Sequence, residues 1–349
     1  MIEKKFMEEI GREDLEYAPL DRLIKFQNKI LRESSFLKDA YKSKLYHKKW
    51  KKLKVKPNNI QGIKDLNKLP YITDEEIDEL YKKNINKTIF HAPQVWFYEK
   101  GGKRWVPYGK NDVKIFLRLI DRMFRITNLG DKDVVLNVAY SAPSLGDILP
   151  YLMAYSQIMK GRKGVKTEII SISLDLLESG VNRLDFTERR KPTVLLMKPS
   201  VALKIRGFLK KTPENIKKAI FYGENLEKYR DEIISYYGGI ELFEMYTTID
   251  NITFSLECEA HDGIHLWLDG CIPEIIPLDE LEKEKVKTVY MPHAINICYA
   301  ENGEIGELVL TVFRESLPLV RYRTGNIVKL ISNKKCKCGR SHPRIKLIN

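Results

Sequence analysis

Two arginines and a turn-like sequence lie close together near the end of the chain. Residues 317–326 read Leu-Pro-Leu-Val-Arg-Tyr-Arg-Thr-Gly-Asn, and strand alternation would put Arg321 and Arg323 on one face. Two forked guanidinium groups beside the amides of a turn can bind an anion such as a phosphate or a carboxylate. The alternative is that the arginines bridge acidic residues across a sheet. The sequence alone leaves both interpretations open.

The residues around the arginines predict a small antiparallel sheet. Thr324, Gly325 and Asn326 are residue types that accept a positive φ in a hairpin turn. The flanking segments, residues 306–313 and 327–331, are apolar and β-branched, as strands are. We therefore expect one strand to enter this turn and another to leave it.

Cysteines and histidines in the last third of the chain offer ligands for a metal ion. Cys336 and Cys338 form a Cys-x-Cys pair, and Cys258 precedes His261 and His265. Three thiolates and one imidazole suit tetrahedral Zn²⁺, with either histidine as the nitrogen ligand. Such a zinc ion would contribute folding energy and not chemistry.

The other two cysteines, Cys271 and Cys298, better fit the alternative that buried thiols pack as small hydrophobic groups. Five cysteines cannot all pair within one chain. The first residues lack the apolar core of a signal peptide, and no apolar run approaches the ~18 residues of a membrane span. We therefore expect a cytoplasmic protein without a membrane partner.

A stretch rich in glycine and lysine is a second candidate for phosphate binding. Gly101, Gly102 and Lys103 follow a strand candidate at residues 95–98 and precede a helix that begins near Asn111 or Asp112. The amides and the lysine of such a loop can hold a phosphate, although the same residues also suit a plain hairpin.

The elements that must position these residues alternate between strands and helices. Helical segments separate four apolar strand candidates, which lie at residues 133–140, 168–173, 193–197 and 219–224. That pattern predicts an α/β fold with a largely parallel sheet. Ligands bind beyond the carboxyl ends of such strands. We therefore expect one crevice to gather residues 140–146, 198–200, 222–224 and 245–250.

The composition and length set the scale of the fold. Of the 349 residues, 43% are hydrophobic and 31% are charged, which excludes a disordered chain. We expect an α/β core over residues 1–251 and a smaller β-rich subdomain over residues 252–349, where strands become short. The net charge of +13 is densest at residues 42–56. Such a cluster could attract polyanions, but we favour lysine stems that cover apolar surface, and nucleic acid is not an expected partner.

Periodicity adds two surface helices to this outline. Apolar residues recur at helical spacing over residues 21–41. Thr73 followed by Glu76 is a capping box that predicts the start of another helix.

Longer stretches carry a resemblance to one enzyme family. They are residues 64–73, 191–200, 256–267, 317–326 and 336–345. On these stretches, and over residues 34–345 as a whole, the chain resembles the phenylacetate-CoA ligase branch of the adenylate-forming enzymes, which also includes coenzyme F390 synthetases. The resemblance implies the large domain of that fold, with mixed, largely parallel sheets flanked by helices.

The resemblance also implies an activity and its ligands. In that family ATP and a carboxylic acid form an acyl adenylate with loss of pyrophosphate, and the acyl group usually passes to coenzyme A. The resemblance therefore implies that this protein binds ATP, Mg²⁺ and a small carboxylic acid, with coenzyme A as a further candidate ligand. Such a protein mainly positions a carboxylate oxygen against the α-phosphate and offsets charge. Two alternatives stay open: adenylylation of a deazaflavin, as by F390 synthetases, and a binding or partner subunit without catalysis.

Residue by residue, the family's phosphate loop falls on residues 96–103, where its hydroxyls are replaced and the glycines and Lys103 remain. The motif at residues 246–250 would place Tyr246 and Thr247 beside adenine and Asp250 near Mg²⁺. Gly223 and Glu224 match a pair that lines the adenine pocket.

The family's Tyr-Arg-Thr-Gly-Asp motif falls on residues 322–326, and the resemblance implies Arg323 as a catalytic cation. Asn326 replaces the aspartate that binds ribose in the family. Because an amide lacks the charge of a carboxylate, nucleotide affinity should be weaker. Family members keep cysteine and histidine at the positions of the four candidate ligands, so the resemblance implies His265, and not His261, as the nitrogen ligand of zinc. Family members continue into a mobile lid domain with a catalytic lysine, which has no counterpart before Asn349. Three outcomes are therefore open. A separate lid subunit or a homodimer completes the site, the protein adenylates without transferring the acyl group, or it binds its ligands without catalysis.

Overall fold

The chain forms two compact units, which are described separately. The computed structural model describes residues 4–84, 93, 95–99, 104–140, 145–159, 167–180, 184–209, 214–247, 253–287 and 290–348. One unit comprises Met1–Phe97, Arg104–Ile115 and His265–Asn349, and the second comprises Tyr98–Lys103 and Phe116–Ile264. Within the described ranges, none of the helices has both the length and the apolar character that crossing a membrane demands.

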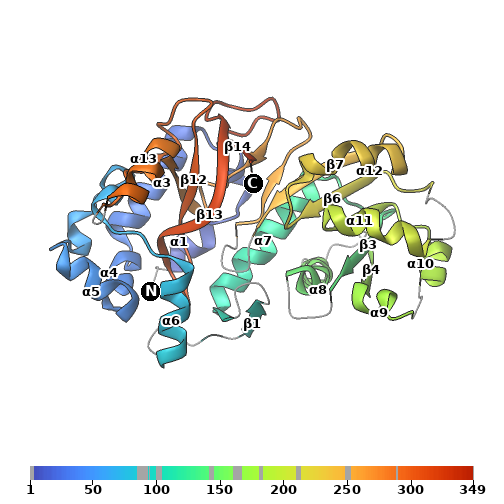
Figure 1. Ribbon diagram of the computed structural model, residues 1–349, viewed down its shortest axis with the longest axis horizontal. Helices are drawn as coiled ribbons and strands as arrows, with labels where there is room; N and C mark the ends of the chain where they lie inside the picture. Colours follow the sequence, from blue (N-terminus) through green and yellow to red (C-terminus); the bar gives the residue numbers. More distant parts are fainter. Residues whose placement is uncertain are drawn as a thin grey trace. The chain divides into compact units, whose positions relative to one another are not determined.

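The second unit is built on a mostly parallel sheet with the order β8-β7-β6-β5-β3-β4 (Figure 1). Only β8 runs antiparallel to its neighbour. The strands are β3 (Val134–Ala139), β4 (Glu168–Ser173), β5 (Val194–Met197), β6 (Lys218–Tyr222), β7 (Glu241–Tyr246) and β8 (Ser255–Glu257). The helices are α7 (Lys110–Ile126), which belongs to this unit from Phe116 onward, α8 (Leu145–Met159), α9 (Leu174–Glu178), α10 (Leu184–Arg190), α11 (Pro199–Lys204) and α12 (Arg230–Tyr237), with short 3₁₀ turns η4 (Ile205–Phe208) and η5 (Leu226–Lys228).

The central strands of this sheet form because their sequences are apolar on both faces. Every residue of β5 is buried, as expected for a parallel strand that helices cover on both sides. Leu136, Met197 and Phe221 from three neighbouring strands belong to one core cluster with residues of α9, α11 and α12. The four strand candidates of the sequence are confirmed, and so is the α/β fold class.

The first unit carries an antiparallel sheet with the order β11-β10-β12-β13-β14. Its strands are β10 (Cys271–Pro277), β11 (Ile295–Asn296), β12 (Ile305–Val312), β13 (Leu319–Ser332) and β14 (Arg344–Leu347). The short strand β9 (Ile264–His265) is the neighbour of β14 in the strand order. A separate two-stranded sheet pairs β1 (Val95–Glu99) with β2 (Arg104–Tyr108).

Helices from the beginning of the chain complete the first unit. They are α1 (Lys4–Glu9), α2 (Glu13–Glu16), α3 (Leu20–Glu33), α4 (Phe36–Lys42), α5 (Lys44–Lys52) and α6 (Asp74–Asn84), with η1 (Pro57–Asn59) and η2 (Ile63–Lys68), and α13 (Leu278–Val286) follows β10. The helix expected at residues 21–41 is interrupted between α3 and α4. There the Ser34 hydroxyl donates to the carbonyl of Ile30 and accepts from the amide of Phe36, and so competes with helical bonding.

Long-range hydrogen bonds tie these helices to the strands of the last third. The amide of Gly11 donates to Asp269, and the Gln27 side chain donates to the carbonyls of Leu268 and Cys271. Figure 1 shows the blue helices beside the orange and red strands. The units therefore differ from the division expected at residue 252, because the helices of residues 4–84 belong to the same unit as the β-rich part.

The helix start predicted at Thr73 and Glu76 is confirmed. α6 begins at Asp74, and the Glu76 carboxylate accepts a hydrogen bond from the amide of Thr73 at 3.1 Å. This contact is the half of a capping box that the acidic residue supplies.

Candidate functional site

The carboxyl ends of the parallel strands bring several predicted site residues to one edge of the second unit. Strand pairing aligns Met197 with Phe221 and Tyr222 with Met245, so the residues that follow these strands lie side by side. They are Lys198 after β5, Gly223 and Glu224 after β6, and Tyr246 and Thr247 at the end of β7. This is the edge at which α/β proteins bind ligands.

Gly223 and Glu224 have defined structural roles at that edge. Gly223 has a φ of +77°, and a Cβ atom built there would lie 3.4 Å from Cε of Lys198, so glycine suits both the turn and the close approach. The Glu224 carboxylate accepts from the hydroxyl of Ser200 at 2.8 Å and from its amide at 3.1 Å. These bonds hold an acidic side chain beside the glycine turn.

The ends of β7 and β3 supply aromatic surface at the same edge. Tyr246 and Thr247 are buried, whereas Tyr140, which follows β3, is partly exposed and lies beside Lys204. An edge with a glycine turn, a fixed carboxylate and aromatic rings can hold a purine ring and its ribose. Asp250, with Gly101, Gly102 and Lys103 of the glycine-lysine stretch, lies outside the described residues.

Arg321 of the first unit is buried in a closed network. Its Nε lies 3.1 Å from Oε2 of Glu274, and both side chains are almost fully buried, with 1% and 2% exposure. The guanidinium also donates to the carbonyl of Leu69 and to the hydroxyl of Tyr71, and it lies 4.1 Å above the Tyr71 ring. Burial raises the pKa of Glu274, and Arg321 opposes that shift.

Arg323 is held by two carboxylates on the same side of the sheet. Its guanidinium donates to Glu307, on the neighbouring strand β12, at 3.1 and 3.0 Å and to both oxygens of Glu284, on α13, at 2.8 Å. Burial lowers the pKa of Arg323, but the hydrogen bonds and negative charges of Glu307 and Glu284 together outweigh burial and leave the pKa raised. The Arg323 guanidinium lies 5.8 Å from the ring of Tyr71.

Both arginines therefore bridge acidic residues, which is the second of the two interpretations that the sequence allows. Their shared position over Tyr71 confirms that they lie on one face. Sequence reasoning missed the acidic partners Glu274 and Glu284. Of the three partners, the sequence indicated only the position of Glu307, because it falls in the strand expected at residues 306–313. A direct role of Arg323 or Asn326 at a ligand stays a prediction.

The hairpin expected at residues 324–326 is wrong. β13 is one continuous strand through Thr324, Gly325 and Asn326, and its pairing with β12 shifts there, between the pairs Glu307 with Ile327 and Val309 with Arg323. Gly325 has a φ of +69°, and the Asn326 side chain donates to the carbonyl of Thr324. These residues form a bulge, which needs the same backbone freedom as a turn. The antiparallel sheet itself is confirmed.

The predicted zinc ligands come together. The ligand atoms of Cys258, His265, Cys336 and Cys338 all lie within 4.8 Å of one another, and Sγ of Cys338 lies 3.5 Å from Nε2 of His265. A tetrahedral zinc ion with ordinary bond lengths separates sulfur and nitrogen ligands by about 3.5 Å. The rival histidine, His261, instead lies 3.4 Å from a carboxylate oxygen of Glu241.

The surroundings of the cluster also fit a metal ion. Nδ1 of His265 lies 3.0 Å from the carbonyl of His342, which orients Nε2 toward Cys338. Gly339 has a φ of +88°, and its amide donates to the carbonyl of Cys336, so the chain turns tightly around the two thiols. Burial raises the pKa of Cys336, but hydrogen bonds to His265 and from the backbone of Cys338 together leave the pKa lowered, which favours the thiolate.

Cys271 and Cys298 are buried and stand outside this cluster. Burial raises the pKa of Cys298 to about 12 and raises that of Cys271 as well. Both thiols therefore stay protonated and pack as small hydrophobic groups, as the sequence predicts.

Comparison with known proteins confirms the resemblance. No family model matches the chain. It is 26% identical over 337 residues to the phenylacetate-coenzyme A ligase of Pseudomonas putida and 24% identical over 336 residues to that of Escherichia coli strain K12. Each alignment covers 91% of this chain and 69% of the relative.

Solved structures confirm the fold. The open conformation of 2-hydroxyisobutyryl-CoA ligase, in complex with 2-HIB-AMP and CoA, matches with a TM-score of 0.73 and 17% identity, over 96% of this chain and 76% of that one. The same ligase in the postadenylation state, in complex with R3-HIB-AMP, gives a TM-score of 0.74 at 18% identity, over 95% and 68% of the two chains. At these identities the comparison establishes the shared fold.

Proposed function

We propose that this protein activates a carboxylic acid with ATP and forms an acyl adenylate. The observation that carries the proposal is the similarity to two phenylacetate-coenzyme A ligases over 91% of the chain. The gathering of Gly223, Glu224, Tyr246 and Thr247 at the ligand-binding edge of the α/β sheet supports it. Coenzyme A is the proposed acceptor of the acyl group.

Each group of residues has a proposed part in this reaction. Tyr246 and Thr247 pack beside the adenine, and Glu224 with Gly223 forms the floor of that pocket. Asp250 binds Mg²⁺, and Lys103 offsets charge on the phosphates, which stabilises the developing transition state. Asn326 accepts a hydrogen bond from the ribose through its amide oxygen.

Pyrophosphate release tests the proposal directly. The purified protein is incubated with ATP, Mg²⁺ and a panel of aromatic and aliphatic acids that includes phenylacetate. We expect pyrophosphate and an acyl-AMP of matching mass for at least one acid, followed by thioester formation when coenzyme A is added. Absence of pyrophosphate with every acid contradicts adenylation of an acid. Heat on titration with ATP alone would then favour a binding protein, and turnover with a deazaflavin would favour the F390-synthetase alternative.

A matched pair of variants locates the nucleotide. Thr247→Val removes a hydroxyl at the carboxyl edge of the sheet, and Thr193→Val removes one at the amino edge, where Thr193 donates to Asp133. We expect Thr247→Val to weaken ATP binding about tenfold, as the loss of one or two hydrogen bonds would. Thr193→Val should lower stability and leave ATP affinity unchanged. Equal effects on affinity contradict a nucleotide at this edge.

We also propose that Cys258, His265, Cys336 and Cys338 hold a structural zinc ion. The ligand spacing and the orientation of His265 support this assignment. Elemental analysis of protein purified without chelator should give about one zinc per chain. Cys338→Ser should lose the metal and melt at a lower temperature, whereas Cys298→Ser, which alters a buried thiol outside the cluster, should keep it. A metal content near zero in the unaltered protein would remove the proposal.

A further inference from the structure

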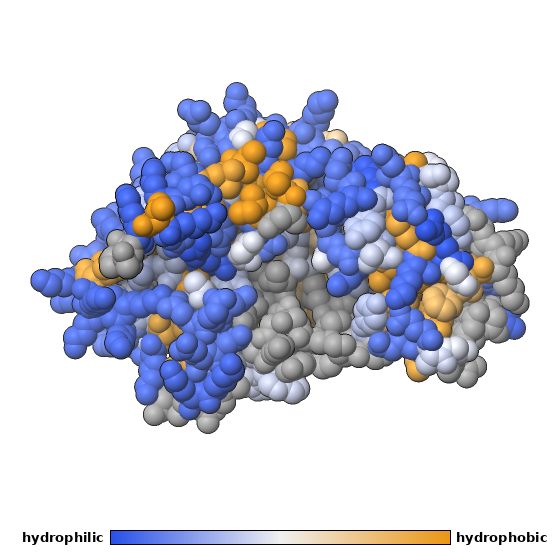
Figure 2. Space-filling model, viewed as in Figure 1, coloured by the Kyte–Doolittle hydropathy of each residue, from blue (hydrophilic) through white to orange (hydrophobic). Residues whose placement is uncertain are grey.

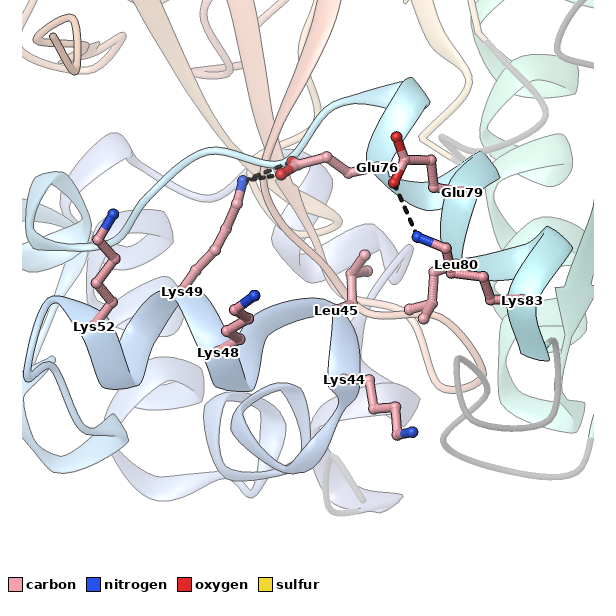
Figure 3. A pocket seen from close by; sticks show the side chains of 9 residues that line it. All are labelled: Lys44, Leu45, Lys48, Lys49, Lys52, Glu76, Glu79, Leu80 and Lys83. Atoms are coloured by element: carbon pink, nitrogen blue, oxygen red, sulfur yellow. Dashed lines mark hydrogen bonds and ion pairs between the residues drawn. The ribbon is translucent and has the colours of Figure 1, made fainter. Parts of the chain in front are cut away.

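A groove lined by lysines lies between two helices of the first unit. It has a volume of about 460 Å³ and opens where α5 meets α6. Its walls are formed by Lys44, Leu45, Lys48, Lys49, Lys52, Glu76, Glu79, Leu80 and Lys83. Figure 3 shows the lysines of α5 in a row opposite the residues of α6, and Figure 2 shows a mainly hydrophilic surface over these helices. Five lysines against two glutamates leave an excess of positive charge.

Both carboxylates of the groove already have lysine partners. Nζ of Lys49 donates to Glu76 at 2.6 Å and so ties α5 to the start of α6. Lys83 lies 3.4 Å from Glu79, one turn earlier on the same helix. The two glutamates therefore pair with Lys49 and Lys83, and not with Lys48 or Lys52, which lie on one face of α5.

That face carries a row of like charge. Lys44, Lys48 and Lys52 are spaced four residues apart, so their side chains stack along the helix and repel one another. The helix dipole favours Lys52 in the last turn but disfavours Lys44 at the first position. Lys48 and Lys52 are exposed and form no hydrogen bond or ion pair with any other residue in the described ranges. Their ammonium groups are free to bind an anion.

We propose that this groove binds a small phosphorylated molecule, free in solution, that carries at least two adjacent phosphate groups. Lys48 and Lys52 are one helical turn apart, about 6 Å, a separation that a diphosphate or triphosphate group can span. The volume falls in the range of small-molecule sites, and Leu45 and Leu80 offer apolar contact for the rest of the ligand.

The choice of phosphate over carboxylate follows from the side chains present. Arginine, whose planar fork matches a carboxylate in two hydrogen bonds, is absent from the lining of the groove. Lysine acts as a compact point charge with three rotating donors, which suits the tetrahedral, multiply charged oxygens of phosphate. An acidic peptide is therefore the weaker fit, and it becomes a separate arm of the test.

Calorimetric titration with inorganic tripolyphosphate tests the site. We compare the unaltered protein with Lys48→Gln/Lys52→Gln and with Lys51→Gln/Lys54→Gln, which removes the same charge from exposed lysines outside the groove. The groove variant should bind at least about tenfold more weakly, because charge-assisted hydrogen bonds are lost. The control variant should change affinity less than about twofold. Equal losses in both variants would show attraction to net charge alone and overturn the proposal.

Chemical footprinting gives a readout local to the groove in the unaltered protein. Acetylation of each lysine is followed by mass spectrometry with and without tripolyphosphate. We expect protection of Lys48 and Lys52 by at least about threefold and no protection of Lys51. Uniform reactivity with tripolyphosphate, or protection by polyglutamate alone, would overturn the proposal. Because this readout needs no turnover, its failure is separate from a failure of the adenylation assay.

Discussion

The ion pair between Arg321 and Glu274 allows a sharp test of what holds the first unit together. Replacing Arg321 with methionine keeps the volume near that of the stem and removes the guanidinium. Glu274, 2% exposed, then stays buried without its cation, and the Leu69 carbonyl and Tyr71 hydroxyl each lose a donor. Breaking a buried pair in this way costs about 3–5 kcal/mol.

A double-mutant cycle separates the pair from its surroundings. Arg321→Met should lower the free energy of unfolding by about 3–5 kcal/mol, whereas Arg321→Met/Glu274→Leu should recover most of that loss. The recovery is expected because two apolar side chains replace two charges that had both given up their hydration. Urea unfolding followed by circular dichroism gives the four free energies.

The pH dependence of the single variant has a definite sign. Burial already raises the pKa of Glu274 in the folded protein, and loss of Arg321 raises it further. The penalty is absent below the carboxyl pKa of the unfolded chain and grows as the pH rises above it. The deficit of Arg321→Met should therefore shrink between pH 7 and pH 4.5. A deficit below about 1 kcal/mol at pH 7, or additive effects in the double variant, would refute this reasoning.

Two further predictions concern single positions. Gly306→Ala should cost about 2–3 kcal/mol, because a Cβ there would lie 1.9 Å from the carbonyl oxygen of Ile276 and force β10 and β12 apart. Gly239→Ala, where the added Cβ meets nothing within 4 Å, is the control for thermal unfolding and should be near neutral. Burial raises the pKa of Glu244 from 4.5 to about 7, so stability present below pH 4.5 is lost as the pH rises toward 7, by about 3 kcal/mol. Glu244→Gln should remove that loss. Its free energy of unfolding should be close to that of the unaltered protein at pH 4.5 and higher than that of the unaltered protein at pH 8. Parallel pH profiles of the two proteins would contradict this prediction.

The parallel strands were predictable because burial on both faces leaves a continuous apolar run. Val194–Met197 is such a run, and the rule that ligands bind beyond strand ends correctly brought Gly223 and Tyr246 to one edge. The Cys/His cluster proposed to hold zinc could also be predicted from the sequence. A pair of cysteines at short spacing predicts a metal site even when the fold is unknown.

The errors arose where one local pattern serves two structures. Thr324, Gly325 and Asn326 suit a hairpin and a bulge equally, and only the partner strand decides between them. The partners of Arg321 and Arg323 are distant in sequence, so local reasoning could not identify them. The division at residue 252 failed to show the packing of the N-terminal helices, because hydrogen bonds such as that of Gly11 to Asp269 leave no periodic signal.

The discontinuous make-up of the first unit has a consequence for synthesis on the ribosome. Residues Met1–Phe97 emerge early, yet the strands that they pack against begin at His265. At ordinary translation rates this interval lasts roughly 10 s or more. The second unit, whose parallel sheet is contiguous, is complete before the nascent chain reaches those strands. The early amphipathic helices must therefore wait with their apolar faces uncovered, which is the stage at which a chaperone would have most to protect.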